Sequence, residues 1–495
     1  MSKLNVVFSS SRGKINRNIY GHFSEHIGGV FYDGLWVGED SKVENVRGFR
    51  KALIDSFKRL NPPVLRWPGG CFAETYDWRD GIGPRQSRPR RVSWWYYNDK
   101  RVETNQVGTH EFVDFCRMAG AEPYFAANMT SVTPLHIRNW IEYCNFPAGL
   151  TTLTDERMQN GAQTTFDVKY WGIGNENWGG GGNMTPEQCA REFVRYTTVC
   201  DNLAGGNLKF IMCGPCGADM DWTTRLMREW AAHKSPAYGM SVHYYCGTAG
   251  SPTAFTEDEW YQLLHQANHM QKILDDHRAA MIPYDPEGKI GIVVDEWGCW
   301  HKDGSGPSKG YNLFEQQSSV RDAVVAALTL NIFNNRCDSV VMANVAQLCN
   351  NLHSLYLAGG EHFVETPNYH VFDMYKGHMD AAQLGVVHDC GLLERKGFAP
   401  MPCVSSSASL GDDGSVLITL ANLLYGKDLE ITLSGVDSSI AGNAEIALLK
   451  GANPQDHNDF SQPERVKLVK SSRAVSDGDS ISLPAASVMA IHITR

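Results

Sequence analysis

Two glutamates stand at the ends of mostly apolar stretches, each beside a tryptophan. Glu176 lies within GNENW at 174–178, and Glu296 lies within DEW at 295–297. Hydrolysis of a glycosidic bond requires two carboxyl groups, one protonated to assist the leaving oxygen and one ionised to attack carbon or to activate water. An apolar, tryptophan-lined surrounding helps to separate their pKa values. The pair therefore indicates glycoside hydrolysis, and carboxylates that only cap a helix or pair with arginine are the alternative.

Other polar side chains follow further apolar runs and are expected at the same end of the fold. They are His22, Glu25, His26, Arg66, Cys71, Asn128, His243, Tyr245, Asn344 and Gln347. Guanidinium, amide, phenol and carboxyl groups among aromatic rings match the hydroxyls and the apolar face of a sugar. Such a set suits neither a phosphate nor a hydride donor.

Two sequence patterns suggest a metal, and neither matches a known ligand spacing. In the zinc motif HExxH the glutamate is adjacent to the first histidine and lies on a helix, whereas here Glu25 precedes the second histidine of His22-x-x-x-His26 in a strand-to-loop segment. Cys213 and Cys216 form one C-x-x-C pair without a second pair. We therefore predict no metal site and no cofactor.

These side chains need a scaffold that brings strand ends together, and the chain supplies eight apolar runs with amphipathic helical stretches between them. Continuously apolar runs are typical of parallel strands buried on both faces, and no glycine-rich dinucleotide turn follows the first run. The pattern predicts an α/β fold, a (β/α)8 TIM barrel with its site at the C-terminal strand ends and with Glu176 and Glu296 on strands four and seven. The runs are Asn18–Ser24, Pro63–Trp67, Pro123–Asn128, Val168–Gly174, Lys209–Cys213, Met240–Tyr245, Ile290–Glu296 and Ser339–Asn344.

Three of the intervening helices are readable in the sequence. Apolar residues at three- and four-residue steps predict a helix over 46–60. The segment TPEQ at 185–188 is a capping box with proline at the first helical position, and it predicts the start of a second helix. A third helix is expected over 315–333.

After about Gly385 the pattern changes to short strands separated by turn residues, which is typical of an antiparallel β-sandwich, here expected to be jelly-roll-like. We predict three parts: an N-terminal strand over 1–14 that joins the C-terminal sandwich, the catalytic barrel over 15–384, and the sandwich over 385–495. The expected strands of the tail are 404–410, 416–423, 429–433, 444–449, 465–469 and 488–493.

Composition excludes several classes of partner. The 495 residues include 45 basic and 55 acidic ones, for a net charge of −10, and the only dense basic stretch is RQSRPRR at 85–91. Nucleic acid is therefore not an expected partner. No 18-residue apolar run occurs, so we expect no membrane span. The start MSKLNVVFSSSRGK lacks a signal-peptide core, and the 13 cysteines are scattered, which favours free thiols in a reducing cytoplasm.

The ordered set of motifs resembles glycoside hydrolase family 51, whose best-known members are α-L-arabinofuranosidases. The motifs occur in family order from about residue 15 to 380, and TPNYHVFDMYKGH and the tail extend the resemblance to nearly the whole chain. The segments that carry it are IYGHFSEHIGG, VLRWPGGCFAETYDWRDGIGPR, ETNQVGTHEFVDFC, KYWGIGNENWGGGG, SVHYY, VVDEWG and MANVAQLCN.

The resemblance implies a retaining, exo-acting arabinofuranosidase that uses oligosaccharides and forms a homo-oligomer, a hexamer in many members. It implies Glu176 as general acid/base and Glu296 as nucleophile. The positions that bind the furanose ring or support the pair are Glu25, Arg66, Cys71, Asn175, Trp178, His243, Tyr245, Trp300 and Gln347.

Two departures from the family pattern concern substrate preference. Cys71 stands where some members have asparagine, and CNNLHSLYL at 349–357 is less apolar than usual. These departures concern linkage and chain length more than the chemistry. Among enzymes on the same barrel, a β-xylosidase or an endo-β-glucanase is the alternative. A carbohydrate-binding protein without activity and a metal-dependent barrel enzyme are the alternatives from other classes.

Overall fold

The chain divides into two units in the computed structural model, which describes residues 2–203, 207–247, 249–302 and 304–495. The first unit comprises residues 21–244 and 275–296. The second comprises residues 1–20, 245–274 and 297–495. Both carboxylates of the predicted pair, Glu176 and Glu296, belong to the first unit.

Eight of the described strands close into a parallel barrel in chain order, so the predicted TIM barrel is confirmed. Most of their residues are buried, because the strands are covered on both faces, and this explains why the runs are apolar without alternation. Each predicted run overlaps one strand. The barrel strands are β2 (Gly21–Phe23), β5 (Val64–Trp67), β8 (Glu122–Ala127), β9 (Tyr170–Ile173), β10 (Lys209–Met212), β11 (Gly239–Cys246), β12 (Gly291–Cys299) and β13 (Val340–Ala346).

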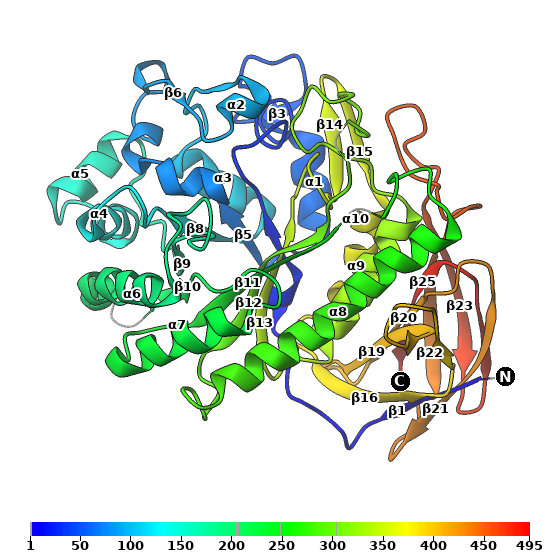
Figure 1. Ribbon diagram of the computed structural model, residues 1–495. Helices are drawn as coiled ribbons and strands as arrows, with labels where there is room; N and C mark the ends of the chain where they lie inside the picture. Colours follow the sequence, from blue (N-terminus) through cyan, green and yellow to red (C-terminus); the bar gives the residue numbers. More distant parts are fainter. Residues whose placement is uncertain (1, 204–206, 248, 303) are drawn as a thin grey trace. The chain divides into compact units, whose positions relative to one another are not determined.

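In the first unit, helices alternate with the barrel strands along the chain (Figure 1). The capping box is confirmed, since the Thr185 hydroxyl accepts a hydrogen bond of 3.3 Å from the Gln188 amide and α6 begins at Pro186. The helices are α1 (Lys51–Arg59), α2 (Tyr96–Asp99), α3 (Thr109–Ala119), α4 (Pro134–Asn145), α5 (Thr152–Gln159), α6 (Pro186–Cys200) and α7 (Met220–His233), and α8 (Glu257–Met281) runs through both units.

Two helices begin later than predicted. Over 46–60 the chain first makes the hairpin β3 (Asn45–Val46) and β4 (Phe49–Arg50), and helix α1 starts only after it. The hairpin turns at Gly48, which has φ +85° and where a Cβ atom would lie 2.3 Å from the Trp36 ring. The helix expected from residue 315 begins at Val320, because Asp322 binds the Ser319 amide and caps the helix there.

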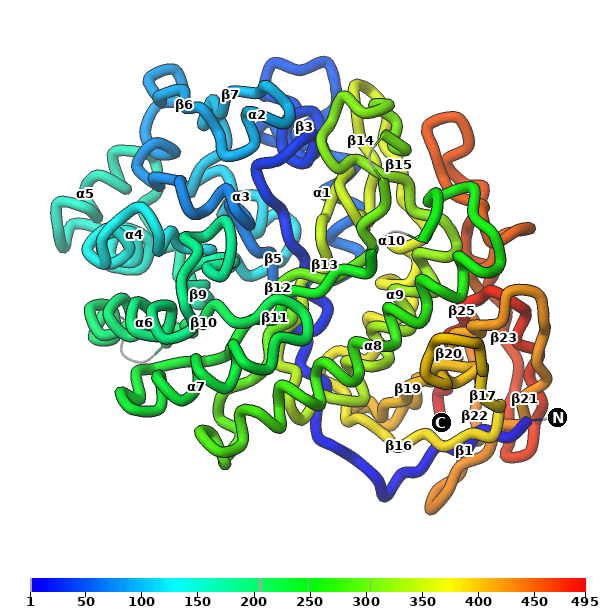
Figure 2. Tube along the Cα trace, viewed as in Figure 1, coloured from blue at the N-terminus to red at the C-terminus, as the bar shows by residue number. Residues whose placement is uncertain are grey.

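In the second unit, nine of the described strands form one hydrogen-bonded sheet. Most neighbouring strands in it are antiparallel, as expected for the predicted sandwich. Strand β1 is the exception, since it pairs antiparallel with β16 and parallel with β21. Figure 2 shows the N-terminal segment running beside β16. The strands are β1 (Ser2–Val7), β16 (Ala382–His388), β19 (Val404–Leu410), β20 (Val416–Asn422), β21 (Leu429–Val436), β22 (Gly442–Leu449), β23 (Leu468–Val475), β24 (Ser480–Leu483) and β25 (Ser487–Thr494).

Helix α9 (Val320–Asn334) attaches this sheet to the rest of the second unit. All of its residues are buried, and its amides Asn331 and Asn334 donate to the Ser405 and Ser407 hydroxyls at 3.2 and 3.1 Å. Burying these amides costs little because they are hydrogen-bonded. Helix α10 (Pro367–Tyr375) packs beside α9, and the short hairpins are β6 (Arg91–Val92) with β7 (Val102–Glu103), β14 (Tyr356–Gly359) with β15 (His362–Glu365), and β17 (Leu392–Leu393) with β18 (Met401–Pro402).

No helix among the described residues is long and apolar enough to cross a membrane.

Candidate active site

Glu176 and Glu296 converge at the C-terminal ends of β9 and β12. One oxygen of each carboxylate and a ring nitrogen of His243 all lie within 4.8 Å of one another. Glu176 is held in the left-handed region at φ +45°, a strained conformation for a residue with a side chain, of the kind that concentrates at functional sites. Glu296 is 6% exposed. Two acidic groups that are 120 positions apart in the chain thus share one small volume.

Arg66, at the end of β5, holds Glu296 and Asn175 together. Its guanidinium donates to Glu296 Oε1 at 2.8 Å and to Asn175 Oδ1 at 2.6 Å, and its Nε lies 3.5 Å from Asp295. Burial alone would lower the pKa of Arg66, but the carboxylates of Asp295 and Glu296 raise it above its ordinary value. The arginine is therefore a permanent positive charge beside Glu296.

His243, on β11, bridges the two glutamates. Its Nδ1 lies 3.0 Å from Glu176 Oε1 and 3.6 Å from Glu296 Oε2. Burial would lower the pKa of His243, but the charges of both glutamates raise it to about 9. Burial raises the pKa of Glu176, yet the hydrogen bond and charge of His243 lower it overall. Both shifts favour a proton on the imidazole, so the contact with His243 outweighs the effect of burial on the pKa of Glu176.

Glu25 follows β2, and hydrogen bonds and close backbone contacts fix the position of its carboxyl group. Its Oε1 accepts hydrogen bonds from the Phe72 amide at 3.0 Å and from Trp95 Nε1 at 3.1 Å. Burial, together with the charge of Glu296, raises the pKa of Glu25 to about 8, so this carboxyl group carries a proton near neutral pH. A Cβ atom at Gly70 would lie 2.5 Å from Glu25 Oε2, which is why the segment after β5 has glycine there.

Cys71, which stands where some family members have asparagine, contacts the Glu176 carboxylate. Its thiol donates to Glu176 Oε2 at 3.6 Å, and burial together with the nearby carboxylates raises the pKa of Cys71, so the group stays protonated. Trp178 is partly exposed, two residues after Glu176. The Trp94 ring lies close to the backbone of the same segment, because a Cβ atom at Gly180 would stand 2.9 Å from it.

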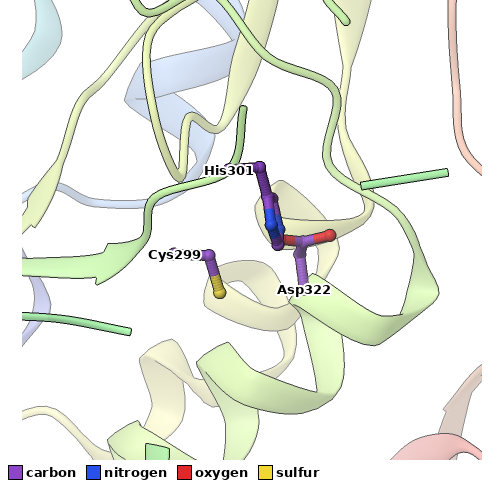
Figure 3. A group of neighbouring side chains, drawn as sticks. All are labelled: Cys299, His301 and Asp322. Carbon is purple, nitrogen blue, oxygen red and sulfur yellow. The ribbon is translucent and has the colours of Figure 1, made fainter. Parts of the chain in front are cut away.

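Three predicted residues, Tyr245, Trp300 and Gln347, belong to the second unit. Trp300 packs edge-on against Tyr245, with ring centroids 5.2 Å apart. Its chain neighbour His301 is hydrogen-bonded to Asp322 at 2.8 Å, and Figure 3 shows that pair beside Cys299. Gln347 follows β13 and is 2% exposed.

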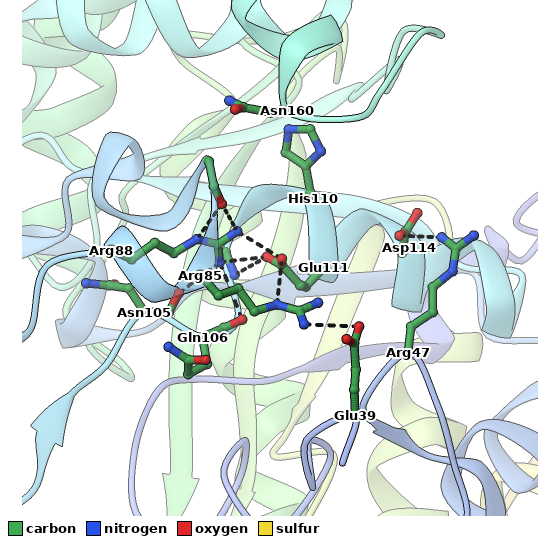
Figure 4. A network of polar contacts seen from close by, with 12 residues as sticks. Glu39, Arg47, Arg85, Arg88, Asn105, Gln106, His110, Glu111, Asp114 and Asn160 are labelled. Atoms are coloured by element: carbon green, nitrogen blue, oxygen red, sulfur yellow. Dashed lines mark hydrogen bonds and ion pairs between the residues drawn. The ribbon is translucent and has the colours of Figure 1, made fainter.

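The loop that carries Trp94 and Trp95 is anchored by the basic segment at 85–91. Figure 4 shows Arg85 and Arg88 converging on Glu111 of α3. Arg88 donates to both oxygens of Glu111, at 3.0 and 2.9 Å, and Arg85 to one of them at 3.2 Å. Burial would raise the pKa of Glu111, but the hydrogen bonds and charge of Arg88 lower it. These arginines form part of the scaffold. The hydrogen bond from Trp95 to Glu25 was not predicted from the sequence. The two adjacent tryptophans in a polar loop are the sequence signal that could have indicated it.

The two metal patterns considered from the sequence are not brought together. His26 contacts Glu103 at 3.0 Å, accepts from Trp67 Nε1 at 2.9 Å and stacks on the Phe72 ring. His22 packs on Phe57, and burial lowers its pKa to about 3. All cysteines, each within the described ranges, are free thiols, and Cys213 is buried whereas Cys216 is exposed.

Known proteins resemble this chain over its whole length. The Alpha-L-arabinofuranosidase 1 domain matches residues 56–248, and the Alpha-L-arabinofuranosidase C-terminal domain matches residues 295–487. A Bacteroides ovatus protein named intracellular exo-alpha-L-arabinofuranosidase is 37% identical over 499 residues, covering 99% of this chain and 95% of that protein.

Solved structures agree with this match. The GH51 arabinofuranosidase of Xanthomonas axonopodis pv. citri has 35% identity and a TM-score of 0.93, covering 100% of this chain and 99% of its own. The α-L-arabinofuranosidase of Thermotoga maritima, described as an arabinose complex, has 27% identity and a TM-score of 0.88, covering 100% of both chains. With the barrel, the sandwich and the carboxylate pair already described, this chain belongs to glycoside hydrolase family 51, the family of α-L-arabinofuranosidases.

Proposed function

We propose that the protein is a retaining, exo-acting α-L-arabinofuranosidase that releases terminal arabinofuranosyl residues by double displacement. The observation that carries this proposal is the spacing of Glu176 and Glu296. One carboxylate oxygen of Glu176 lies within 4.8 Å of one carboxylate oxygen of Glu296. Retaining glycosidases hold their carboxyl groups about 5–5.5 Å apart, whereas inverting enzymes leave about 6.5–9.5 Å for a water molecule. The short spacing supports attack by a carboxylate over attack by water.

In the first step Glu296 attacks the anomeric carbon and the bond to the leaving oxygen breaks, which forms a glycosyl-enzyme. The contact of 2.8 Å from Arg66 orients the attacking carboxylate and keeps it ionised. Asn175, held at 2.6 Å by the same guanidinium, has its amide nitrogen buried without a hydrogen-bond partner in the described chain. A sugar hydroxyl supplies the missing acceptor in this proposal.

The proton for the leaving oxygen comes from the Glu176–His243 pair. The pair shares one proton across 3.0 Å, and its transfer from Nδ1 to Oε1 leaves a neutral imidazole and a protonated Glu176. Glu176 then protonates the leaving oxygen. In the second step the Glu176 carboxylate takes a proton from water, which attacks the glycosyl-enzyme and releases Glu296.

The remaining predicted residues form the sugar site in this proposal. Protonated Glu25 offers a donor to a ring hydroxyl, the Cys71 thiol contacts Glu176, and the others supply hydrogen bonds or stacking surfaces as the family resemblance implies: Trp178, Tyr245, Trp300 and Gln347. The Thermotoga relative, described as an arabinose complex, supports arabinose as the sugar that this protein recognises. The proposed substrate class is arabino-oligosaccharides or arabinoxylan fragments. The name of the Bacteroides relative, an intracellular exo-alpha-L-arabinofuranosidase, supports cleavage in the cytoplasm.

A panel of aryl α-L-arabinofuranoside, aryl β-D-xyloside and soluble β-glucan tests the substrate class. Hydrolysis of the arabinofuranoside at a kcat/KM at least tenfold above the xyloside supports the proposal. Preference for the xyloside or the glucan would instead favour the alternative enzyme. We also propose a homo-oligomer, a hexamer by family resemblance, and light scattering on the purified protein measures its mass directly.

A further inference from the structure

A second group of metal-ligating side chains lies in the second unit, outside the proposed sugar chemistry. Cys299 ends β12, His301 follows it, and Asp322 lies in the first turn of α9 (Figure 3). One ligating atom from each lies within 4.8 Å of the others, and all three residues are buried. Some point between three such atoms lies within about 2.8 Å of each, and Zn–S and Zn–N bonds are about 2.3 and 2.0 Å, so small side-chain rotations would bring the three atoms to bonding distance.

His353 lies beside this group but outside it, so it would have to rotate inward to become a fourth ligand. It is fully buried, and its Nδ1 lies 3.8 Å from Asp322 Oδ1, too far for a hydrogen bond. Within the described part of the chain, neither ring nitrogen of His353 nor Nδ1 of His301 has a hydrogen-bond partner. Buried ring nitrogens without partners are costly, and a cation bound after rotation of the His353 ring would satisfy one of its two nitrogens.

The surrounding chain holds these ligands in place. The Gln316 side chain accepts from the His301 amide at 2.8 Å and donates to the Cys299 carbonyl at 3.1 Å. Asp322 Oδ2 accepts from the Ser319 amide and hydroxyl at 2.8 and 3.0 Å, which leaves Oδ1 directed to His301. Gly298 has φ +144°, and a Cβ atom there would lie 2.4 Å from the Cβ of His353. Second contacts of this kind orient ligands in metal sites.

We propose that Cys299, His301, Asp322 and His353 form a structural Zn²⁺ site. A thiolate and two imidazoles select zinc over calcium or magnesium, which prefer all-oxygen sites. Cys299, His301 and Asp322 supply three ligands, and His353 rotated inward completes a tetrahedral shell without an open position, which is typical of a structural site. On binding, the Cys299 thiol releases its proton to solvent and the cation takes its place. Trp300 stands between two ligands, so the ion fixes the loop that carries this ring.

The test begins with wild-type protein purified without metal-affinity tags or chelators. We expect about one zinc per chain by mass spectrometry of the metal content. After the zinc is removed with a chelator, titration with Co²⁺ should give a thiolate-to-cobalt charge-transfer band that saturates at one equivalent. Absence of bound zinc together with absence of this band at excess Co²⁺ overturns the proposal.

Variants assign the band to one thiol. Cys299→Ser should abolish it, and His353→Gln should weaken Co²⁺ affinity at least tenfold. Cys71→Ser, beside the Glu176–His243–Glu296 cluster, and Cys246→Ser, a buried thiol on the neighbouring strand, should keep it. Circular dichroism confirms that each variant is folded. Loss of the band in Cys71→Ser with retention in Cys299→Ser would place the metal at the sugar site and contradict the proposal.

Discussion

The Nδ1 atom of His243 lies 3.0 Å from an oxygen of Glu176 and 3.6 Å from an oxygen of Glu296. One imidazole therefore contacts both carboxylates of the proposed catalytic pair. Their charges raise the pKa of His243 to about 9. In the proposed mechanism His243 therefore stores the proton, and Glu176 passes it to the substrate.

Replacement of His243 tests this route. His243→Gln should lower kcat/KM on an unactivated arabino-oligosaccharide by about 10²-fold, the scale of general acid catalysis. It should affect an aryl substrate with a good leaving group much less. The alkaline fall in wild-type kcat/KM near pH 9 should also disappear in the variant. The exposed His233→Gln is the matched control, and an unchanged pH profile in His243→Gln would refute the proton-storage role.

Separate losses are expected for the two carboxylates. Glu296→Ala should abolish turnover of every substrate, because no nucleophile remains. Glu176→Ala should slow an unactivated substrate by about 10²–10⁴-fold but spare formation of the glycosyl-enzyme from aryl substrates that need no proton. A burst of aryl alcohol followed by slow turnover measures this directly. Equal losses on both kinds of substrate would contradict the assignment.

Glu25 makes the stability of the folded protein depend on pH. Its folded pKa of about 8 lies above the ordinary value of 4.5, so between these pH values the folded state holds a proton that the unfolded state has lost. The free energy of unfolding therefore falls as the pH rises from about 4.5 to 8. Glu25→Gln should flatten the decline of Tm over this interval, whereas the exposed Glu361→Gln should not. A parallel decline in Glu25→Gln and wild type would show that Glu25 is not the source.

The arginine anchor of the tryptophan loop should affect substrate binding more than chemistry. Arg88→Ala removes hydrogen bonds to both oxygens of Glu111 and should cost about 2–4 kcal/mol of stability. The loop then holds Trp95 less firmly on Glu25, so KM should rise several-fold while kcat changes little. The control is the exposed Arg90→Ala in the same segment. A fall in kcat with unchanged KM would mean that the loop acts on the reacting groups instead.

Much of the fold could be predicted from sequence periodicity. The barrel runs were readable because strands buried on both faces must be apolar throughout, and the α6 start was readable from its capping residues. The helices at 46 and 315 were placed too early because a tight turn at Gly48 and a cap at Ser319 decide where they begin. The strand predicted over 465–469 lies at Leu468–Val475, where most residues are exposed and the apolar signal is weak. Strand β24 was missed because it has only four residues, two of them buried.

The sequence indicated which residues lie together at the site, but it did not indicate which of them holds the proton. Strand-end position and family resemblance named Arg66, Glu176, His243 and Glu296, and these residues are in contact. The location of the proton was not predictable, because it depends on which side chain lies 3.0 Å from Glu176. The role of the Arg85–Arg91 segment was likewise invisible until Glu111 was seen facing it.

In the proposed mechanism Glu296 forms a covalent bond to the sugar, and one of its carboxylate oxygens lies within 4.8 Å of one of Glu176. Proton NMR of an aryl α-L-arabinofuranoside during its hydrolysis identifies the first anomer released, before it equilibrates in water. Two displacements predict α-L-arabinofuranose as the initial product. Initial release of the β-anomer would show a single displacement by water and would contradict the account.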